Sequence, residues 1–538
     1  MSIQFHRPIA FWSGTLAIVV GVLLHLPDFL SAGDMHYMLR DMQMSSMMLA
    51  GMFLIVAGFA LATWGLLPRR SVADTRHAGV RYQFRTMDDA ALTPTHWGLM
   101  LVLAIALVID TMKPATLGFV LPGMSAEYGF PPSRGAWLLL CALSGTTIGS
   151  VFWGIMADRI GRRAAILLAA LMFIGTSICG TMPLFGANLF MCFLMGVAAG
   201  GMLPIVYALM AESVPARPRG FLVVLHGGLG TVGGTLAAAG CAALLEPIFS
   251  WRILWLLNLP TGIMMLILNR WIPESPRYLL EHGRLDEARD VLRDYGVTIE
   301  EQAGLPAGEP ELPLPGTEWS ELRALFRNPF AVQTMVVLTY GLAWGAINWG
   351  FIAFLPTFLR AAGFGAGASS YLLFLSSVVA IPATVLVAYA YGRWSSRNSM
   401  ILFAGASIIA VFGLAWALGG ANSSPCAQGC SRGMIVGLLA LLYGATGGVI
   451  AMLSPYTAEV YPTRYRGTGS GLSAGSSKLG GLMAGVGSVT GLLAVSGNLL
   501  RPAVIVSIPM AVAALLVAAR GLETRGRRLE ELADHRIM

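Results

Sequence analysis

Fourteen apolar stretches of about 20 residues each run along this 538-residue chain, and they constrain its fold more than any other feature. A helix of that length crosses the hydrocarbon core of a bilayer. Charged residues make up 12% of the chain, whereas about a quarter of a soluble domain is charged. We therefore predict an all-α multi-pass membrane protein and exclude the disordered, collagen-like and disulfide-rich secreted classes. The expected spans are 9–29, 46–67, 97–122, 137–157, 164–182, 189–211, 221–245, 251–271, 330–358, 370–391, 400–418, 434–458, 469–496 and 503–520.

Arginines are concentrated in a few of the segments that connect these stretches. Cytoplasmic loops carry an excess of Lys and Arg, so these segments are expected on the cytoplasmic side. Both termini are then cytoplasmic, and the membrane is expected to be a bacterial inner membrane. The net charge of +7 reflects this topology and gives no reason to expect nucleic acid. The arginine-rich segments are 69–96, 158–163, 217–219, 273–328, 393–397, 464–466 and the tail after 520.

An internal repeat divides most of the chain into two halves. Residues 200–220 and 447–467 align without a gap, and the shared positions include Glu212 with Glu459 and Arg219 with Arg466. Both copies run from the membrane to the cytoplasmic side, so the repeat is parallel. Two six-helix bundles related by an axis along the membrane normal are a known transporter architecture.

Two loop motifs resemble signatures of the major facilitator superfamily. GIMADRIGRR, residues 154–163, is similar to the cytoplasmic loop signature of that family, and PESPRYL, residues 273–279, is similar to a motif of its sugar-porter, organic-ion and metabolite–proton symporter branches. The resemblance implies secondary transport by alternating access, driven by a proton gradient, with no cofactor and in a monomer. The resemblance covers residues 97–525, and it implies six-helix bundles at 97–272 and 329–520, a central cytoplasmic loop at 273–328 and a tail at 521–538. The apolar runs and charges add a transmembrane hairpin at 1–68 and a basic linker at 69–96.

The loop motifs are expected to control opening on the cytoplasmic side. Glycines permit a tight turn, and arginines offer forked donors to nearby carboxylates. The resemblance implies ion pairs that form in one conformation and break in the other, and a permanent clamp is the alternative. The expected gating residues are Gly154, Asp158, Arg159, Gly161, Arg162, Arg163, Glu212, Arg219, Glu459 and Arg466, with the signature Pro273, Glu274, Ser275, Pro276 and Arg277.

Asp110 and Lys113 are ionisable residues inside the apolar run 97–122. Asp110 follows Trp97 by thirteen residues, or roughly 20 Å of helix, which places it at membrane depth. Ionisable groups there are costly and are functional candidates by default. We expect Asp110 to bind the proton and Lys113 to bind substrate charge, and a structural ion pair between them is the alternative.

Other residues of the expected substrate and proton cavity lie on three later spans. Lys478 offers a second positive charge, which makes an organic anion the leading substrate class, although its side chain could instead extend to the membrane surface. His226 can titrate near neutral pH or serve as a satisfied core histidine. Aromatic planes and an amide suit a small organic ligand, and tryptophans can also mark the membrane interface. The latter group is Trp344, Asn348 and Trp349.

The function predicted from these residues is proton-coupled symport of a small organic carboxylate. A sugar or polyol carrier and an organic-ion exporter are the alternatives within transport, and a ligand sensor that does not translocate is the alternative outside it. The sequence has no phosphate-binding loop and no metal-protease motif, so we expect neither an enzyme nor a metal centre.

Two further features stay open at this stage. The turn after the first span is rich in methionine, with His36 beside it. Thioethers suit Cu(I), but adaptable packing at a membrane surface explains the turn equally simply. Cys426 and Cys430 share one loop and could form a disulfide in an oxidising space.

Overall fold

The computed structural model describes residues 7–40, 42–67, 92–281, 284–296, 318–418, 432–461, 463–493 and 499–524. Regular structure in this part of the chain is entirely helical, as predicted. Twelve of its helices are long and apolar enough to cross a membrane. They are Pro8–Ser31, Ser46–Leu66, Pro94–Tyr128, Pro132–Ala157, Arg162–Thr181, Pro218–Phe249, Ile253–Trp271, Ala331–Ala361, Ala366–Trp394, Ser396–Leu418, Arg432–Val460 and Leu500–Arg520.

Two expected spans, 189–211 and 469–496, are missing from that set. The first is divided into α9 (Phe185–Ala199) and α10 (Met202–Ser213). The break falls at Gly200 and Gly201, since paired glycines lower helix propensity. The second forms α22 (Thr463–Val489), a helix of 27 residues whose many Gly and Ser residues lower its hydropathy.

The first compact unit comprises residues 1–110, 145–219 and 255–314. Helix α8 contacts α1, α3, α9 and α13 within it. Its whole helices are α1 (Pro8–Leu23), α2 (Leu26–Ser31), η1 (Gly33–Met35), α3 (Ser46–Leu66), α8 (Arg162–Gly175), η2 (Thr176–Thr181), α9, α10, α13 (Asn258–Leu268), η3 (Asn269–Trp271), α14 (Pro276–Glu281) and α15 (Leu285–Asp294).

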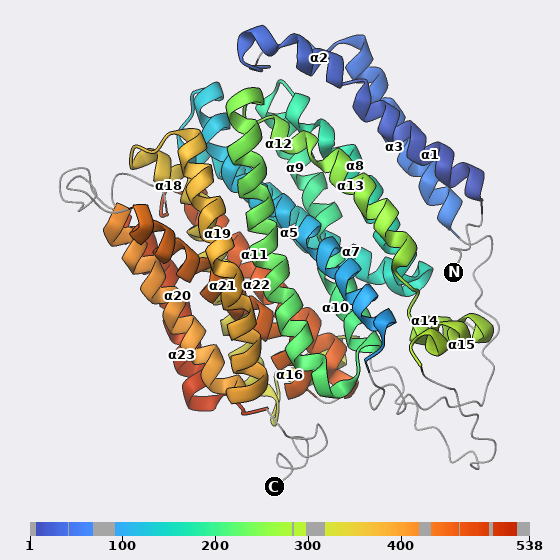
Figure 1. Ribbon diagram of the computed structural model, residues 1–538, viewed down its shortest axis with the longest axis vertical. Coiled ribbons are helices and arrows are strands. Elements are labelled where there is room, and N and C mark those ends of the chain that lie inside the picture. Colours follow the sequence, from blue (N-terminus) through green and yellow to red (C-terminus); the bar gives the residue numbers. More distant parts are fainter. Residues whose placement is uncertain are drawn as a thin grey trace. The chain divides into compact units, whose positions relative to one another are not determined.

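Helices α1 and α3 pack side by side along their length (Figure 1). Glycines make this close approach possible, because a Cβ atom at Gly14 would lie 2.5 Å from the carbonyl oxygen of Gly58. Larger residues there would force the helices apart, as in other small-residue membrane interfaces. The pair also reaches α8, where a Cβ atom at Gly175 would lie 2.9 Å from the Ile55 side chain.

The second compact unit comprises residues 111–144, 220–254 and 315–538. Helices α17, α20, α21, α22 and α23 pack together within it. Helix α19 lies against α21 (Figure 1). Its whole helices are α6 (Pro132–Gly135), α16 (Glu318–Leu325), α17 (Ala331–Gly350), η4 (Ile352–Phe354), α18 (Leu355–Ala361), α19 (Ala366–Tyr389), η5 (Ala390–Trp394, a π-helix), α20 (Ser396–Leu418), α21 (Arg432–Val460), α22 and α23 (Leu500–Arg520).

Four helices continue from one unit into the other. They are α5 (Pro94–Tyr128), α7 (Trp137–Ile160), α11 (Ala216–Phe249) and α12 (Ile253–Leu256). The halves 97–272 and 329–520 are a different division, based on the sequence repeat, and they stay predictions.

Several sequence features fall partly or wholly outside the described residues. These include Cys426, Cys430 and almost all of the linker 69–96. In the methionine-rich turn, Met35 and Met38 are exposed and Met48 is buried. Among the described residues, no group of three or more His, Cys, Asp or Glu side chains could hold a metal ion.

Candidate functional site

Asp110 and Lys113 lie one turn apart on α5, and both are buried, with 4% and 3% of their surface exposed. Pro114 follows them inside the helix. Because proline has no N–H, residue 114 cannot donate the usual helical hydrogen bond to the Asp110 carbonyl. The backbone next to the two charges is therefore less constrained than an unbroken helix.

Thr111 fixes this part of α5 to α11. Its hydroxyl donates to the Gly230 carbonyl oxygen at 2.6 Å. A side chain at Gly234, one turn further along α11, would collide with Thr111. The close approach of the two helices thus depends on small residues in α11.

Lys113, His226, Lys478 and the three α17 residues all belong to the second unit, while Asp110 ends a segment of the first. His226 is buried, and its Nδ1 atom lies 2.9 Å from the Leu222 carbonyl oxygen. Lys478 is half-buried on α22. It lies two turns before Gly485, on the same helical face, and Gly485 faces Leu140 of α7.

The aromatic residues of α17 take part in helix packing. Trp344 donates from its indole N–H to the Thr446 carbonyl oxygen of α21 at 3.0 Å. Trp349 lies directly against Gly481 of α22. Asn348 is partly exposed, one turn from Trp344. The two tryptophans thus hold α17 against its neighbours.

Gly161 and Glu274 form the centre of the loop motif in the first unit. Gly161 has φ = +95°, a left-handed conformation that favours glycine. It precedes α8, whose first backbone N–H groups, from Arg162 and Arg163, donate to the Glu274 carboxylate at 2.8 and 3.3 Å. A carboxylate at a helix N-terminus is stabilising, both as a hydrogen-bond acceptor and through the helix dipole. Glu274 belongs to the predicted signature, but its partners were not predicted.

Burial raises the pKa of the Glu274 carboxyl, and the backbone N–H groups that donate to it oppose the shift. The same segment is shaped by Ser275, which is fully buried and accepts the Tyr278 N–H at 3.3 Å, with Pro276 as the first residue of α14. This is an N-cap followed by proline, a common helix start. Pro273 is also buried.

Arg163 completes the connection between α8 and the end of α13. Its guanidinium donates to the carbonyl oxygens of Asn269 and Arg270 at 3.1 and 3.2 Å. These carbonyls belong to η3, at the end of the helix, where the helix dipole favours a cation. Glu274 therefore caps the start of α8, and Arg163 of α8 caps the helix end that precedes Glu274.

The second unit repeats this arrangement with different residues. The Glu523 carboxylate accepts the Ser396 N–H at 2.9 Å at the start of α20, together with the Ser395 and Ser396 hydroxyls. The Arg397 guanidinium donates to the carbonyl oxygens of Val517 and Ala518, near the end of α23. Glu523 was not predicted, although it follows the last span of the second six-helix half as Glu274 follows the last span of the first.

Glu459 also holds this end of the second unit together. Its carboxylate accepts the Tyr391 hydroxyl at 2.7 Å and the Thr524 hydroxyl at 2.6 Å. Arg219, of the first unit, donates to the Val214 carbonyl oxygen at 2.8 Å. Gly154 has no described atom within 4 Å of where its Cβ would lie. The side chains of Asp158, Arg159, Glu212, Arg277 and Arg466 lie outside the described residues.

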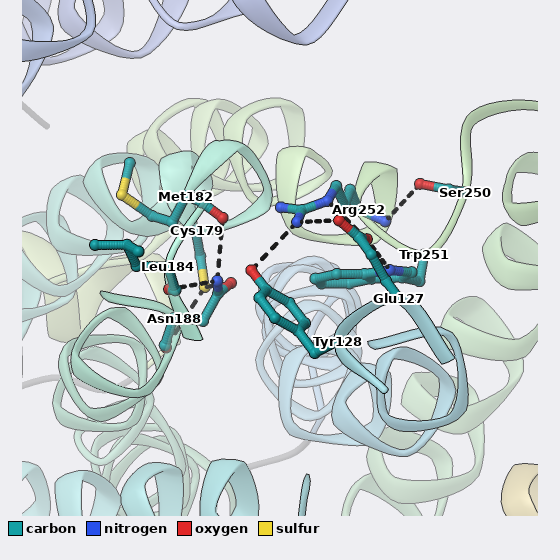
Figure 2. Close-up of polar contacts among 9 residues, drawn as sticks. All are labelled: Glu127, Tyr128, Cys179, Met182, Leu184, Asn188, Ser250, Trp251 and Arg252. Carbon is teal, nitrogen blue, oxygen red and sulfur yellow. Dashed lines mark hydrogen bonds and ion pairs between the residues drawn. The ribbon is translucent and has the colours of Figure 1, made fainter. Parts of the chain in front are cut away.

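Two buried Arg–Glu pairs in the second unit were not predicted. In the first, the Arg252 guanidinium donates to both Glu127 oxygens, at 2.6 and 3.1 Å, and Trp251 donates to the same carboxylate at 2.9 Å (Figure 2). The second joins Arg360 of α18 to Glu246 of α11. Both glutamates are nearly inaccessible, so each pair holds charge in an environment of low polarity.

Comparisons with known proteins agree with the helical architecture. The model of the Major Facilitator Superfamily matches residues 99–485. The niacin transporter NiaP of Acinetobacter baylyi is 25% identical over 81% of this chain and 96% of its own. The 4-hydroxybenzoate transporter PcaK of Pseudomonas putida is also 25% identical, over 81% of this chain and 95% of its own.

Solved structures show the same fold. The proton:xylose symporter XylE is 18% identical, covers 82% of this chain and 99% of its own, and has a TM-score of 0.60. The family match spans well over half of the 538 residues. The chain therefore belongs to the major facilitator superfamily, and it is a multi-pass membrane transporter without enzymatic function.

Proposed function

We propose that this protein is a secondary active transporter that carries a small organic carboxylate together with protons. The observation that carries the proposal is that Asp110 and Lys113 are both buried in α5. Relatives that match four-fifths of the chain are named as transporters of niacin and of 4-hydroxybenzoate, which are organic acids. A buried lysine attracts an anion strongly, because the surroundings screen its charge weakly.

Asp110 is the proposed proton site, and Lys113 and Lys478 are proposed to bind the substrate carboxylate. Protonation of Asp110 would remove the negative charge that competes with the substrate for Lys113, which links proton binding to substrate binding. His226 is a second candidate for proton binding. Asn348 and the aromatic faces of Trp344 and Trp349 would contact the rest of the substrate.

Alternating access would come from rocking of residues 97–272 against residues 329–520. The cytoplasmic latch would use Asp158, Arg159, Arg162, Glu212, Arg219, Glu459 and Arg466. The reciprocal caps built on Glu274 and Glu523 support this proposal, because each connects the start of one helix to the end of another within its unit. The proton gradient would supply the driving force, without a cofactor.

The proposed topology has fourteen spans, with the hairpin 1–68 added to a twelve-helix core. Splitting of 189–211 into α9 and α10 is compatible with one span, because α9 and α10 together cover residues 185–213. The arginine-rich loops support cytoplasmic termini in a bacterial inner membrane. We propose a monomer as the working unit.

Uptake into proteoliposomes tests the proposed function. Labelled nicotinate, 4-hydroxybenzoate and xylose would be supplied outside, at pH 5.5 and at pH 7.5, with the inside at pH 7.5. The proposal expects saturable uptake of at least one acid, faster with the inward proton gradient, and no uptake of xylose. Uptake of xylose alone would favour a sugar carrier, and binding of an acid without any uptake would favour a sensor.

A further inference from the structure

The Glu246–Arg360 pair makes fewer hydrogen bonds than the other buried Arg–Glu pair. Arg252 and Glu127 satisfy each other with two hydrogen bonds, and Trp251 adds a third. Glu246, in contrast, accepts from Arg360 through Oε1. Its Oε2 atom and the Nε atom of Arg360 are both buried and have no hydrogen-bond partner.

Further unused polar atoms lie on the helices that carry or adjoin this pair. The Thr357 hydroxyl, one turn before Arg360 on α18, is buried without a partner. So is the hydroxyl of Ser370, one turn after Gly367 on α19, and Gly367 faces Pro247 of α11. Buried polar groups are normally satisfied. These unused donors, one of which belongs to the Arg360 guanidinium itself, therefore indicate that a polar ligand completes the set.

The two members of the pair differ in accessibility. The Glu246 side chain is 6% exposed, whereas the Arg360 side chain is 22% exposed. An anion that arrives from solvent therefore reaches the guanidinium before it reaches the glutamate. The fork of a guanidinium matches a carboxylate, with two parallel hydrogen bonds. The unused Nε atom gives Arg360 such a fork once displacement of Glu246 uncovers it.

We propose that Arg360 is a docking residue for the carboxylate of the transported substrate, at the end of the bundle that the proposed topology places on the periplasmic side. Glu246 supplies an internal carboxylate that occupies Arg360 until substrate displaces it. Thr357 supplies an additional hydroxyl donor. This inference rests on the proposed transport of organic carboxylates, and it adds a second binding step, separate from Asp110 and Lys113.

The proposal makes the two members of one ion pair behave in opposite ways. Loss of Arg360 removes the binding group, while loss of the Glu246 charge removes its competitor. Glu246→Gln should lower the KM for carboxylate uptake several-fold, because Gln keeps the shape and can still accept a hydrogen bond. Removal of a charge-assisted hydrogen bond costs about tenfold or more in affinity, so the double variant Glu246→Gln/Arg360→Gln should raise KM by at least that factor. The double variant is used because Arg360→Gln alone leaves a buried unpaired carboxylate.

The test measures initial uptake of labelled nicotinate and 4-hydroxybenzoate into proteoliposomes that contain wild type or one variant. Arg501→Gln is the matched control, because Arg501 is an exposed arginine of the second unit, on the same expected side of the membrane. Binding of the better substrate to purified protein in detergent, by equilibrium dialysis, gives a readout that does not depend on translocation. Thermal unfolding of each variant establishes that the protein is folded.

Opposite shifts, with KM and Kd lower in Glu246→Gln and higher in the double variant, support the proposal. Equal shifts in the same direction would show that the pair only fastens α11 to α18, and the docking role would be overturned. Unchanged values in both variants would overturn it as well. Absence of acid uptake and binding in wild type would instead refute the proposed function, so the two failures are distinguishable.

Discussion

Removal of the Glu274 side chain should destabilise the start of α8. Its carboxylate accepts three backbone N–H groups, from Arg162, Arg163 and Ser275, at 2.8, 3.3 and 3.2 Å. Loss of a helix cap costs about 0.5–2 kcal/mol, and each buried donor left without a partner costs about 1–3 kcal/mol. Because water can reach part of this site after truncation, we expect Glu274→Ala to lower the free energy of unfolding by about 2–4 kcal/mol.

Thermal unfolding of purified protein in detergent is the appropriate assay. A loss of this size in a unit of this length corresponds to a decrease in Tm of about 4–16 °C. Glu287→Ala is the control, because Glu287 pairs with Arg284 at the surface of the neighbouring α15, with side chains 39% and 31% exposed. An exposed pair of this kind contributes about 0–1 kcal/mol. If Glu274→Ala and Glu287→Ala unfold at the same temperature, the capping argument is wrong.

Three other predictions follow from the same contacts and from the proposed cavity. Glu523→Ala should lower Tm by an amount similar to Glu274→Ala. Because the hydrogen-bond partners of the two carboxylates do not overlap, the losses in free energy of unfolding should add in the double variant to within about 0.5 kcal/mol. Thermal unfolding of the single and double variants checks this, and strong non-additivity would contradict it. Burial raises the pKa of the Glu274 carboxyl above its ordinary value of 4.5. The stability that this group gives the folded state is therefore complete below its ordinary pKa and declines as pH rises through its folded-state pKa. The Tm of wild type minus that of Glu274→Gln should fall from pH 4 to pH 7, and a difference that grows with pH would show that the pKa is lowered instead. Lys113→Gln combined with Lys478→Gln should reduce carboxylate uptake by at least about tenfold in proteoliposomes, and wild-type rates in that variant would remove both lysines from the binding site.

Much of the fold could be predicted from the pattern of apolar residues. Spans such as 400–418 and 434–458 correspond closely to α20 and α21, because long apolar runs have one stable arrangement in a bilayer, a helix. Length and hydropathy could not predict the interruption at Gly200 and Gly201. The glycine pair is the sequence signal of that break, and packing also requires a glycine there, since a Cβ atom at Gly200 would lie 2.5 Å from the backbone of α7.

The polar contacts of the site were less predictable than the spans. The loop motif drew attention to arginine side chains and to Glu212 and Glu459. The structure shows that Glu274 binds backbone N–H groups, which carry no sequence signal of their own. Glu523 could have been found by extending the repeat search to the segment after each sixth span. The Glu246–Arg360 pair joins residues 114 positions apart, and only the folded chain brings them together.

Coupled proton movement is the most direct test of the proposed mechanism. Proteoliposomes that contain a pH-sensitive dye inside would receive nicotinate or 4-hydroxybenzoate outside, with protein-free liposomes correcting for passive entry of the neutral acid. The account predicts that the protein acidifies the interior beyond this background in step with acid uptake, and that Asp110→Asn abolishes the excess acidification. Acid uptake with no excess acidification in wild type, or with full acidification in Asp110→Asn, would contradict it.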